Sequence, residues 1–264
     1  MAAKRALQGP YLKGQPGVFG GECPGRGYSQ NMTDPGESAR ISPLHKAVWW
    51  AQDYAYATGW QVRGFLSRVQ PASFRTGTLQ PVVIIPGVYE NWQFMMPLIR
   101  AIHDAGHPVH VVTVLQRNKL KVPEAARLVA QHLEEAGLHN AILVAHSKGG
   151  LIGKYAMLSL DPEHRIDRMI AVCAPFSGSR YARYMLLPSL RIFSPRNALT
   201  LQMAREQTIN SRITSLYGPF DPHIPEGSVL PGATNIELPV AGHFRILGDP
   251  GTARIIVEQL GLPA

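Results

Sequence analysis

Short apolar segments alternate with longer amphipathic ones from about residue 80 to the end of the chain. The segments 81–85 and 141–145 are apolar throughout and too short for buried helices, which predicts central strands covered on both faces. Between them, apolar residues recur every three or four positions, as in a helix with one buried side. The pattern predicts strands at 81–85, 109–115, 141–145, 169–174, 213–217 and 236–240, and helices at 92–102, 123–136, 149–160 and 252–260.

This alternation predicts an α/β fold, because helical crossovers between parallel strands cover both faces of a sheet. Residues 177–211 break the rhythm and mix aromatic and apolar side chains with arginines, so we expect an insertion there. Residues 1–40 are expected to form a flexible leader, since 14–27 is rich in Gly and Pro and has few groups to bury. The stretch 1–31 resembles a vector leader or an early start, and 41–264 is expected to be one domain.

A further helix is expected over about 42–69, ahead of the first strand. Ser42 and Pro43 suit its N-cap and first turn, and Trp49, Trp50 and Tyr54 make it rich in aromatic side chains. Such a helix either packs on the domain or lies on a membrane or lipid surface. Its polar residues do not form one clean basic face, which favours packing.

Composition limits the partners and the location. A net charge of +8 with a pI of about 9.7 suits anionic surfaces, but the chain has no block of Lys or Arg and no nucleic-acid motif. No nucleic-acid partner is therefore expected, while peripheral contact with an anionic membrane stays open. No stretch is apolar enough for a signal peptide or a membrane span, so the expected location is cytoplasmic. Cys23 and Cys173 are not expected to pair, and no metal or cofactor motif is present in the sequence.

The clearest chemical signal lies at 143–150, where an apolar strand meets a Gly-rich helix at Ser147. A nucleophilic serine on a sharp strand-to-helix turn needs small residues two positions before and after it, and Ala145 and Gly149 are small. The N-terminus of the helix also favours developing negative charge. Ser147 is therefore the predicted nucleophile, and the adjacent His146 is expected to brace the turn and not to act as the base.

At these residues the chain resembles the α/β-hydrolase superfamily, and within it the bacterial lipases and carboxylesterases. The resemblance covers about residues 80–262 and rests on four segments in the same order: 85–88, 145–149, 174–179 and 242–244. The usual elbow is Gly-x-Ser-x-Gly, so Ala145 is a departure that stays within the size limit. The resemblance implies an α/β-hydrolase fold with a mostly parallel sheet, helices on both faces and a cap or lid insertion after the sixth strand.

In the superfamily the nucleophile comes first along the chain, the acid second and the histidine third. Asp221 follows the expected strand 213–217, and His243 lies in the loop after the next strand, which makes them the predicted acid and base. Glu226 is the main rival acid. Asp167 precedes a strand and so points to the wrong end of the sheet, while His223 is expected to line the entrance.

The remaining site residues are placed by proximity to the nucleophile. The backbone N–H groups of Val88 and Lys148 are the predicted oxyanion hole, although Pro86 stands where lipases usually carry a supporting histidine. The Lys148 side chain is expected to point to solvent or else to favour an anionic group of the substrate. The predicted substrate contacts are Tyr89, Trp92 and Phe176.

The sequence thus predicts a serine hydrolase of carboxylic esters, a lipase or esterase that works through an acyl-enzyme without a metal or cofactor. Its expected partner is a small-molecule or lipid ester. Two alternatives stay open. One is an acyltransferase on the same triad, and the other is a non-catalytic lipid-binding or interaction protein on a hydrolase fold.

Overall fold

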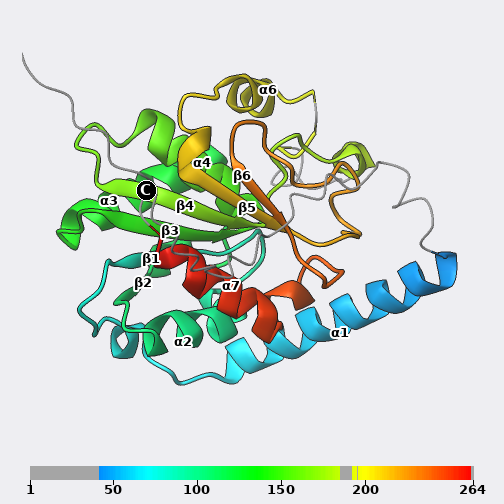
Figure 1. Cartoon of the computed structure of the whole chain (residues 1–264), viewed down its shortest axis with the longest axis horizontal. Coiled ribbons are helices and arrows are strands. Elements are labelled where there is room, and N and C mark those ends of the chain that lie inside the picture. The colour runs from blue at the N-terminus through cyan, green and yellow to red at the C-terminus, as the bar shows by residue number, and fades with distance from the viewer. Residues whose placement is uncertain (1–41, 185–191, 195, 263–264) are drawn as a thin grey trace, which may run out of the picture.

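The computed structural model describes residues 42–184, 192–194 and 196–262, and within them the chain builds one parallel sheet (Figure 1). Its six strands lie in the order β2-β1-β3-β4-β5-β6, and every neighbouring pair is parallel. This confirms the predicted α/β class with a parallel sheet. The strands are β1 (Val82–Ile85), β2 (Val109–Val111), β3 (Ala141–His146), β4 (Ile166–Val172), β5 (Ile213–Tyr217) and β6 (Thr234–Glu237).

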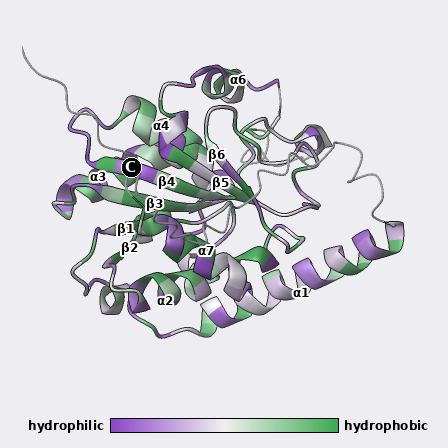
Figure 2. Cartoon of the chain, in the orientation of Figure 1, coloured by the Kyte–Doolittle hydropathy of each residue, from purple (hydrophilic) through white to green (hydrophobic). Residues whose placement is uncertain are grey.

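Helices cover both faces of the sheet, as the alternation predicted. On one face pack α3 (Val122–Glu135) and α4 (Lys148–Ser159), and on the other α2 (Met96–Asp104) and α7 (Pro250–Leu260). Successive residues of β1 alternate between the two layers: Val83 and Ile85 belong to the first, Val82 and Ile84 to the second. Strand β1 is accordingly apolar along its whole length, and β3 is apolar up to His146 (Figure 2).

The long helix α1 (Pro43–Leu66) runs along the outside of the second layer and extends past the body of the domain (Figure 1). The Ser42 side chain caps its N-terminus by accepting from the His45 N–H. Its contacts are with the short 3₁₀ turns η3 (Trp92–Met95) and η7 (Arg245–Gly248), which lie beside the carboxyl ends of β1 and β6.

Several boundaries differ from the prediction because short apolar runs do not separate strand from turn, and the strand expected at 236–240 is β6 at Thr234–Glu237. The strand expected at 109–115 ends at Val111, and the 3₁₀ turn η4 (Thr113–Leu115) follows it. Gln116 then takes a positive φ of 49°, which reverses the chain. The expected strand 169–174 begins earlier, at Ile166, and ends at Val172.

The segment 177–211 follows β4, which is the fourth strand in chain order within the described residues and not the sixth. The described chain enters the sheet at β1 after a helix, so no described strand precedes Val82. The segment contains η5 (Arg180–Tyr184) and α6 (Ala198–Arg205), and η6 (Asn210–Arg212) leads from it into β5. Residues 185–191, 195 and the expected leader 1–40 with Cys23 lie outside the described residues, and the cap role of the segment stays a prediction.

Parallel pairing brings the carboxyl ends of the strands to one edge. Ile85 is paired with Ala145, His146 with Val172, and Tyr217 with Glu237. In open parallel sheets this edge is where ligands bind. None of the helices in the described ranges is long and apolar enough to cross a membrane.

Candidate active site

Ser147 lies at the turn between β3 and α4 in a backbone conformation that few residues adopt. Its φ is 51° and its ψ is −119°. A Cβ added at Gly149 would lie 2.2 Å from the Ile85 carbonyl oxygen, and one at Gly150 would lie 2.4 Å from the Ala174 Cβ. The Gly-rich start of α4 is therefore required for close packing of this helix on β1 and β4, and the packing holds the serine in its strained turn.

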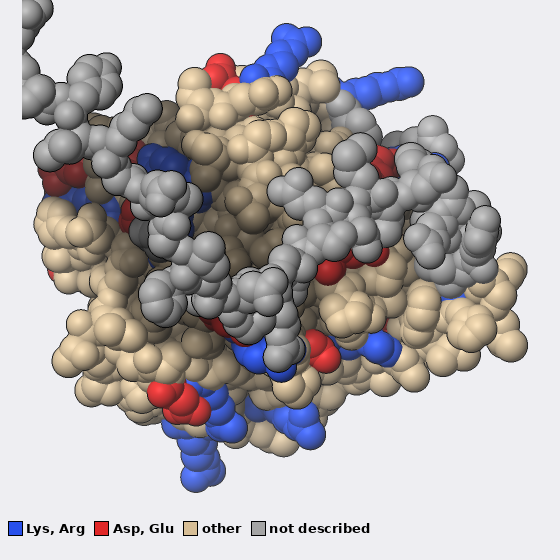
Figure 3. All heavy atoms as spheres, in the orientation of Figure 1, with Lys and Arg blue, Asp and Glu red and all other residues tan. Residues whose placement is uncertain are grey.

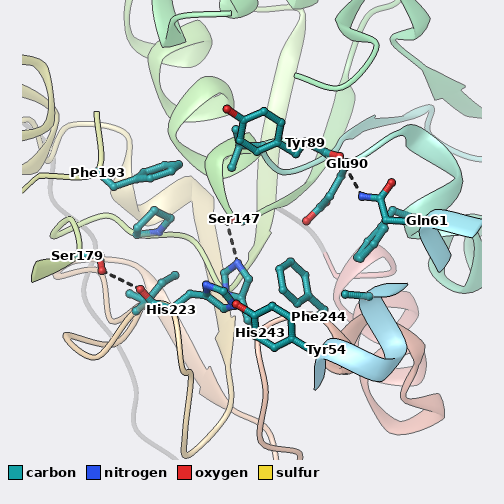
Figure 4. A pocket seen from close by; sticks show the side chains of 15 residues that line it. Tyr54, Gln61, Tyr89, Glu90, Ser147, Ser179, Phe193, His223, His243 and Phe244 are labelled. Atoms are coloured by element: carbon teal, nitrogen blue, oxygen red, sulfur yellow. Dashed lines mark hydrogen bonds between the residues drawn. The ribbon is translucent and has the colours of Figure 1, made fainter. Parts of the chain in front are cut away.

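Ser147, His243 and Asp221 form one hydrogen-bonded series at the carboxyl edge of the sheet, and Figure 4 shows the contact between Ser147 and His243. The Ser147 Oγ lies 3.0 Å from His243 Nε2, and His243 Nδ1 lies 2.7 Å from Asp221 Oδ2. The acid and the histidine are carried by the loops after β5 and β6, as the residue order predicted. With the proton of His243 on Nδ1, the ring donates to Asp221 and accepts from the serine hydroxyl.

Burial and pairing together set the charges of Asp221 and His243. Burial alone would lower the pKa of His243, but the charge of Asp221 and the hydrogen bond to it raise that pKa above its ordinary value. Burial alone would raise the pKa of Asp221, but the His243 charge and hydrogen bonds from His243 and from the His223 backbone hold it below its ordinary value. The acid is therefore ionised at neutral pH and stabilises positive charge on the histidine.

The other groups near Asp221 have different partners. The second oxygen of Asp221 accepts from the His223 N–H at 2.7 Å and from the Ile224 N–H at 3.0 Å. The rival acid Glu226 bonds the backbone and the guanidinium of Arg180, both at 2.9 Å. His223 lines the cavity beside Ser147, as expected. Burial, together with the His243 charge, lowers its pKa to about 3, so it is neutral.

Glu90, which the sequence did not indicate, and His146, which was expected to brace the turn, connect the loop after β1 with the backbone of His243. His146 Nδ1 lies 2.8 Å from Glu90 Oε1, and His146 Nε2 lies 2.9 Å from the backbone oxygen of His243. Glu90 Oε2 in turn accepts from the Gly87 N–H at 2.7 Å. Both ring nitrogens of His146 therefore lie within hydrogen-bond distance of an oxygen atom, one on the side chain of Glu90 and one on the backbone of His243.

Removal of the charge on Glu90 is expected to weaken this connection. The side chains of His146 and Glu90 are 0% and 3% exposed, so Glu90→Gln puts a neutral amide in place of the carboxyl group that bonds His146 Nδ1 in this buried site. We expect the free energy of unfolding to fall by about 3 kcal/mol, measured by urea denaturation. The matched control is Glu134→Gln at an exposed position of α3, which should leave the midpoint unchanged. Equal midpoints for the two variants would contradict a stabilising contact.

The loop that carries the predicted oxyanion donor Val88 is fixed by backbone and side-chain hydrogen bonds. The Tyr89 N–H donates to the Arg117 carbonyl at 2.7 Å, and Tyr89 takes a positive φ of 63°. Asn118 Nδ2 donates to the Pro86 carbonyl at 2.6 Å. Asn118 therefore supports the loop at the position where the histidine of lipases is replaced by Pro86.

The Lys148 side chain does not point to solvent, and that expectation is wrong. The residue is fully buried, and its ammonium group donates to the backbone oxygens of Asn118 and Leu120. Burial lowers its pKa to about 8, against a smaller opposite effect of Glu124. The carbonyls of the tight turn around Asn118 need donors, and Lys148 supplies them. Its backbone N–H is the first of α4 and belongs to the unpaired N–H groups of that helix start.

Beside Ser147 lies a largely apolar cavity of about 350 Å³ (Figure 4). Val88 and Tyr89 line it, as do residues of α1 (Tyr54, Ala57 and Gln61) and the aromatic side chains Phe94, Phe193 and Phe244. Trp92 and Phe176, predicted as substrate contacts, are not part of this lining. Trp92 packs edge-on against Phe74, and Phe176 is buried below the Lys154 ammonium, 6.0 Å from its ring centroid.

Helix α1 holds the loops on either side of the cavity. Asp53 is fully buried, and its Oδ1 accepts from the backbone N–H groups of Phe244 at 2.7 Å and Arg245 at 2.8 Å. Gln61 Nε2 donates to the Tyr89 carbonyl at 3.0 Å. One helix thus fixes the loop of His243 and the loop of Val88, and no pattern in the sequence indicated either contact.

Cys173, Asp221 and His243 bring their ligand atoms within 4.8 Å of one another, which is close enough to consider a metal. The donor set does not suit one. Burial raises the pKa of Cys173 well above its ordinary value, so the thiol keeps its proton. The Asp221 and His243 atoms are already hydrogen-bonded to each other.

Comparisons with known proteins bear on the fold of the chain. No protein-family model matches the chain. A stretch of 107 residues is 29% identical to lysosomal thioesterase PPT2-B of Xenopus laevis and covers 38% of this chain and 37% of that protein, so it spans well under half the length of this relative.

Solved structures match over a larger part of the chain. The mature form of the Bacillus licheniformis lipase BlEst2 superposes with a TM-score of 0.59 at 16% identity, over 74% of this chain and 95% of that one. The α/β-hydrolase MGS-MChE2, from a lagoon-sediment metagenome of Mar Chica, Morocco, gives 0.52 at 17% identity, over 70% and 91%. These identities establish the fold alone, and by its fold the chain is an α/β-hydrolase.

Proposed function

We propose that the chain is a serine hydrolase of carboxylic esters that uses Ser147, His243 and Asp221 as its catalytic triad. The observation that carries the proposal is the 3.0 Å contact between Ser147 Oγ and His243 Nε2, in line with the 2.7 Å contact between His243 Nδ1 and Asp221. A serine hydroxyl becomes a nucleophile when a base in hydrogen-bond reach is itself oriented by a carboxylate.

In the first half-reaction, Ser147 Oγ attacks the ester carbonyl carbon while His243 Nε2 takes the hydroxyl proton. Negative charge develops on the carbonyl oxygen, where the N–H groups of Val88 and Lys148 would stabilise it. The carbon–oxygen bond to the alcohol then breaks, and the alcohol leaves with the proton from His243. In the second half-reaction, water gives its proton to His243 and attacks the acyl-enzyme, which releases the carboxylic acid and restores Ser147.

The cavity favours an apolar acyl group. Its lining is mostly aromatic and aliphatic, and its most polar members, Glu90 and Gln61, already bond protein groups. An apolar chain buried there loses contact with water and gains van der Waals contacts. A lipase or esterase substrate with such an acyl chain fits, and the structurally similar BlEst2 is described as a lipase.

A thioester is the second candidate substrate, because the curated relative is described as a thioesterase. The same triad serves both, since only the leaving group differs. An acyltransferase is the same chemistry with an alcohol in place of water in the second half-reaction.

The test is covalent labelling with a fluorophosphonate probe together with a p-nitrophenyl ester series from acetate to palmitate and a matched acyl thioester. We expect modification at Ser147 and turnover that is best for one apolar chain length. A higher rate with the thioester would assign the thioesterase, and acyl transfer to added alcohol in excess of hydrolysis would assign the transferase. A chain that neither reacts with the probe nor turns over any substrate would be an interaction protein on a hydrolase fold.

A further inference from the structure

Among the described residues, nothing covers a largely apolar row of side chains along the outer side of helix α1. At 1.5 Å per residue its 24 residues span about 36 Å. Large side chains on it are strongly exposed, with Leu44 at 73%, Phe65 at 83% and Leu66 at 70%, and Val48 and Val62 are about half exposed. Exposed apolar patches of this extent are unusual on a protein without a partner surface.

The exposed residues share one side of the helix because they recur at helical spacing. Leu44, Val48, Ala51, Ala55, Val62 and Phe65 are separated by three, four or seven positions and are all exposed. The opposite side of α1 holds the buried Asp53 and Gly64. We name the outer row together with Leu66 the α1 face. In Figure 3 the region where α1 lies in Figure 1 is mostly free of charged side chains.

The charges of this segment have one sign at the surface. Residues 43–69 contain Lys46, Arg63 and Arg68, and their only acid is Asp53, which is fully buried and bonded to the His243 loop. The whole chain adds a net charge of +8. Lys46 packs over Phe220, whereas Arg63 and Arg68 are exposed near the C-terminal end of the α1 face. An apolar helix face with exposed cations at one end and no exposed acid in this segment is complementary to a lipid surface with anionic headgroups.

The α1 face is also next to the cavity. Tyr54, Ala57 and Gln61 of α1 form part of the cavity wall, and the exposed Trp50 ring lies 4.5 Å from the Tyr54 ring. Trp and Tyr side chains prefer the headgroup level of a membrane, where one end of the ring is apolar and the other is hydrated. A lipid bound along α1 would thus lie beside the entrance to Ser147.

We propose that the α1 face is a docking surface for anionic lipid. The inference rests on the proposed function only in linking this surface to the ester site. A second copy of the chain fits less well, because the middle of the row has only the small side chains of Ala51 and Ala55, where paired helices need large aliphatic side chains. The preceding residues 14–27 are rich in Gly and Pro and have few apolar groups to cover it.

The test measures vesicle sedimentation of the full chain in the Ser147→Ala background, so that catalysis plays no part. The vesicles are phosphatidylcholine with or without phosphatidylglycerol. We expect binding to the anionic vesicles that weakens with added salt, and a loss of roughly tenfold or more in the double variant Phe65→Ser/Leu66→Ser. The control is Leu79→Ser, which removes a half-exposed leucine ahead of β1, at the opposite edge of the sheet from the cavity.

Three results would overturn the inference: no vesicle binding by the parent protein, equal binding by the double variant, or a dimer by light scattering that the double variant converts to a monomer. Folding of the double variant is checked with Ser147 intact, by its turnover of a short soluble ester. Turnover equal to that of the parent together with lost vesicle binding supports docking. If none of the proteins, the parent included, turned over the ester while the parent still bound vesicles, the proposed function would be refuted and the docking surface would stand.

Discussion

Replacement of Ser147 by alanine is expected to lower kcat/KM for the preferred ester by about 10⁴-fold or more, with little change in substrate affinity. The hydroxyl is the only described group that lies 3.0 Å from His243 Nε2 and lines the cavity, so its loss removes the acyl-enzyme route. The cavity wall and the predicted oxyanion donors remain, and they would account for the residual rate.

The comparison of Ser147→Ala with the parent protein is informative because alanine fits the space that the serine occupies. The substituted side chain would keep the small volume and the packing of α4 on β1, so we expect an unchanged unfolding temperature. Ser177→Ala, at an exposed serine in the loop after β4, is the matched control and should retain full activity. Steady-state kinetics on the three proteins checks the expectation. If Ser147→Ala retained a tenth of the parent rate, the acyl-enzyme mechanism would be wrong.

The proximity of Ser147, Asp221 and His243 was predictable because their positions depend on local rules and on topology. A buried strand, a serine and small residues on both sides specify a sharp turn wherever they occur together, as at 143–150. Parallel strands then bring the loops after β5 and β6 to the same edge of the sheet. The positions of Asp221 and His243 could be predicted without information on distant side chains, because each residue follows the carboxyl end of a strand.

The supporting groups could not be predicted, since each acts on a residue far away in the chain. Glu90 bonds a histidine 56 positions later, and Asp53 bonds backbone groups 191 and 192 positions later. Neither residue lies in a recognisable motif, and a charged side chain is expected to be exposed when the sequence does not indicate its partner. The burial of Lys148 could not be predicted either, because its partners are backbone carbonyls that come together only in the folded turn at Asn118.

Of the three aromatic residues predicted to contact the substrate, only Tyr89 lines the cavity, and the reason is a different one. Tyr89, Trp92 and Phe176 all lie close to the nucleophile or to the oxyanion loop in sequence, but proximity does not tell which side of a loop a ring takes. Tyr89 faces the cavity, whereas Trp92 packs on Phe74 and Phe176 is buried in the layer of α4. Conversely, Tyr54 lines the cavity from α1, a helix for which packing on the domain was only one of two interpretations.

Replacement of Asp221 by asparagine is expected to lower kcat by about 10⁴-fold while substrate affinity stays nearly the same. The carboxylate accepts from His243 Nδ1 at 2.7 Å and so keeps Nε2 free to take the serine proton. An asparagine can turn its amide N–H₂ toward Nδ1, which selects the tautomer that carries its proton on Nε2. That tautomer cannot act as the base, although every atom of the site is in place.

The pH dependence separates this explanation from simple damage to the loop. His243 must be neutral to accept the proton, so activity falls as the pH drops through its pKa. Because Asp221 raises that pKa above its ordinary value of 6.5, the acid limb of kcat/KM for the parent protein should lie above pH 6.5. In Asp221→Asn the negative charge is gone and burial still lowers the pKa of His243, so the limb of the residual activity should move to lower pH.

Glu226→Gln is the control that the sequence itself supplies, since Glu226 was the rival acid in the same loop. It bonds Arg180 and makes no contact with His243 in the structure, so its replacement should change kcat by less than about twofold. Rate profiles against pH for the three proteins decide between the two acids. A large loss in Glu226→Gln together with an active Asp221→Asn would exchange their roles, and it would require the loop after β5 to rearrange when substrate binds.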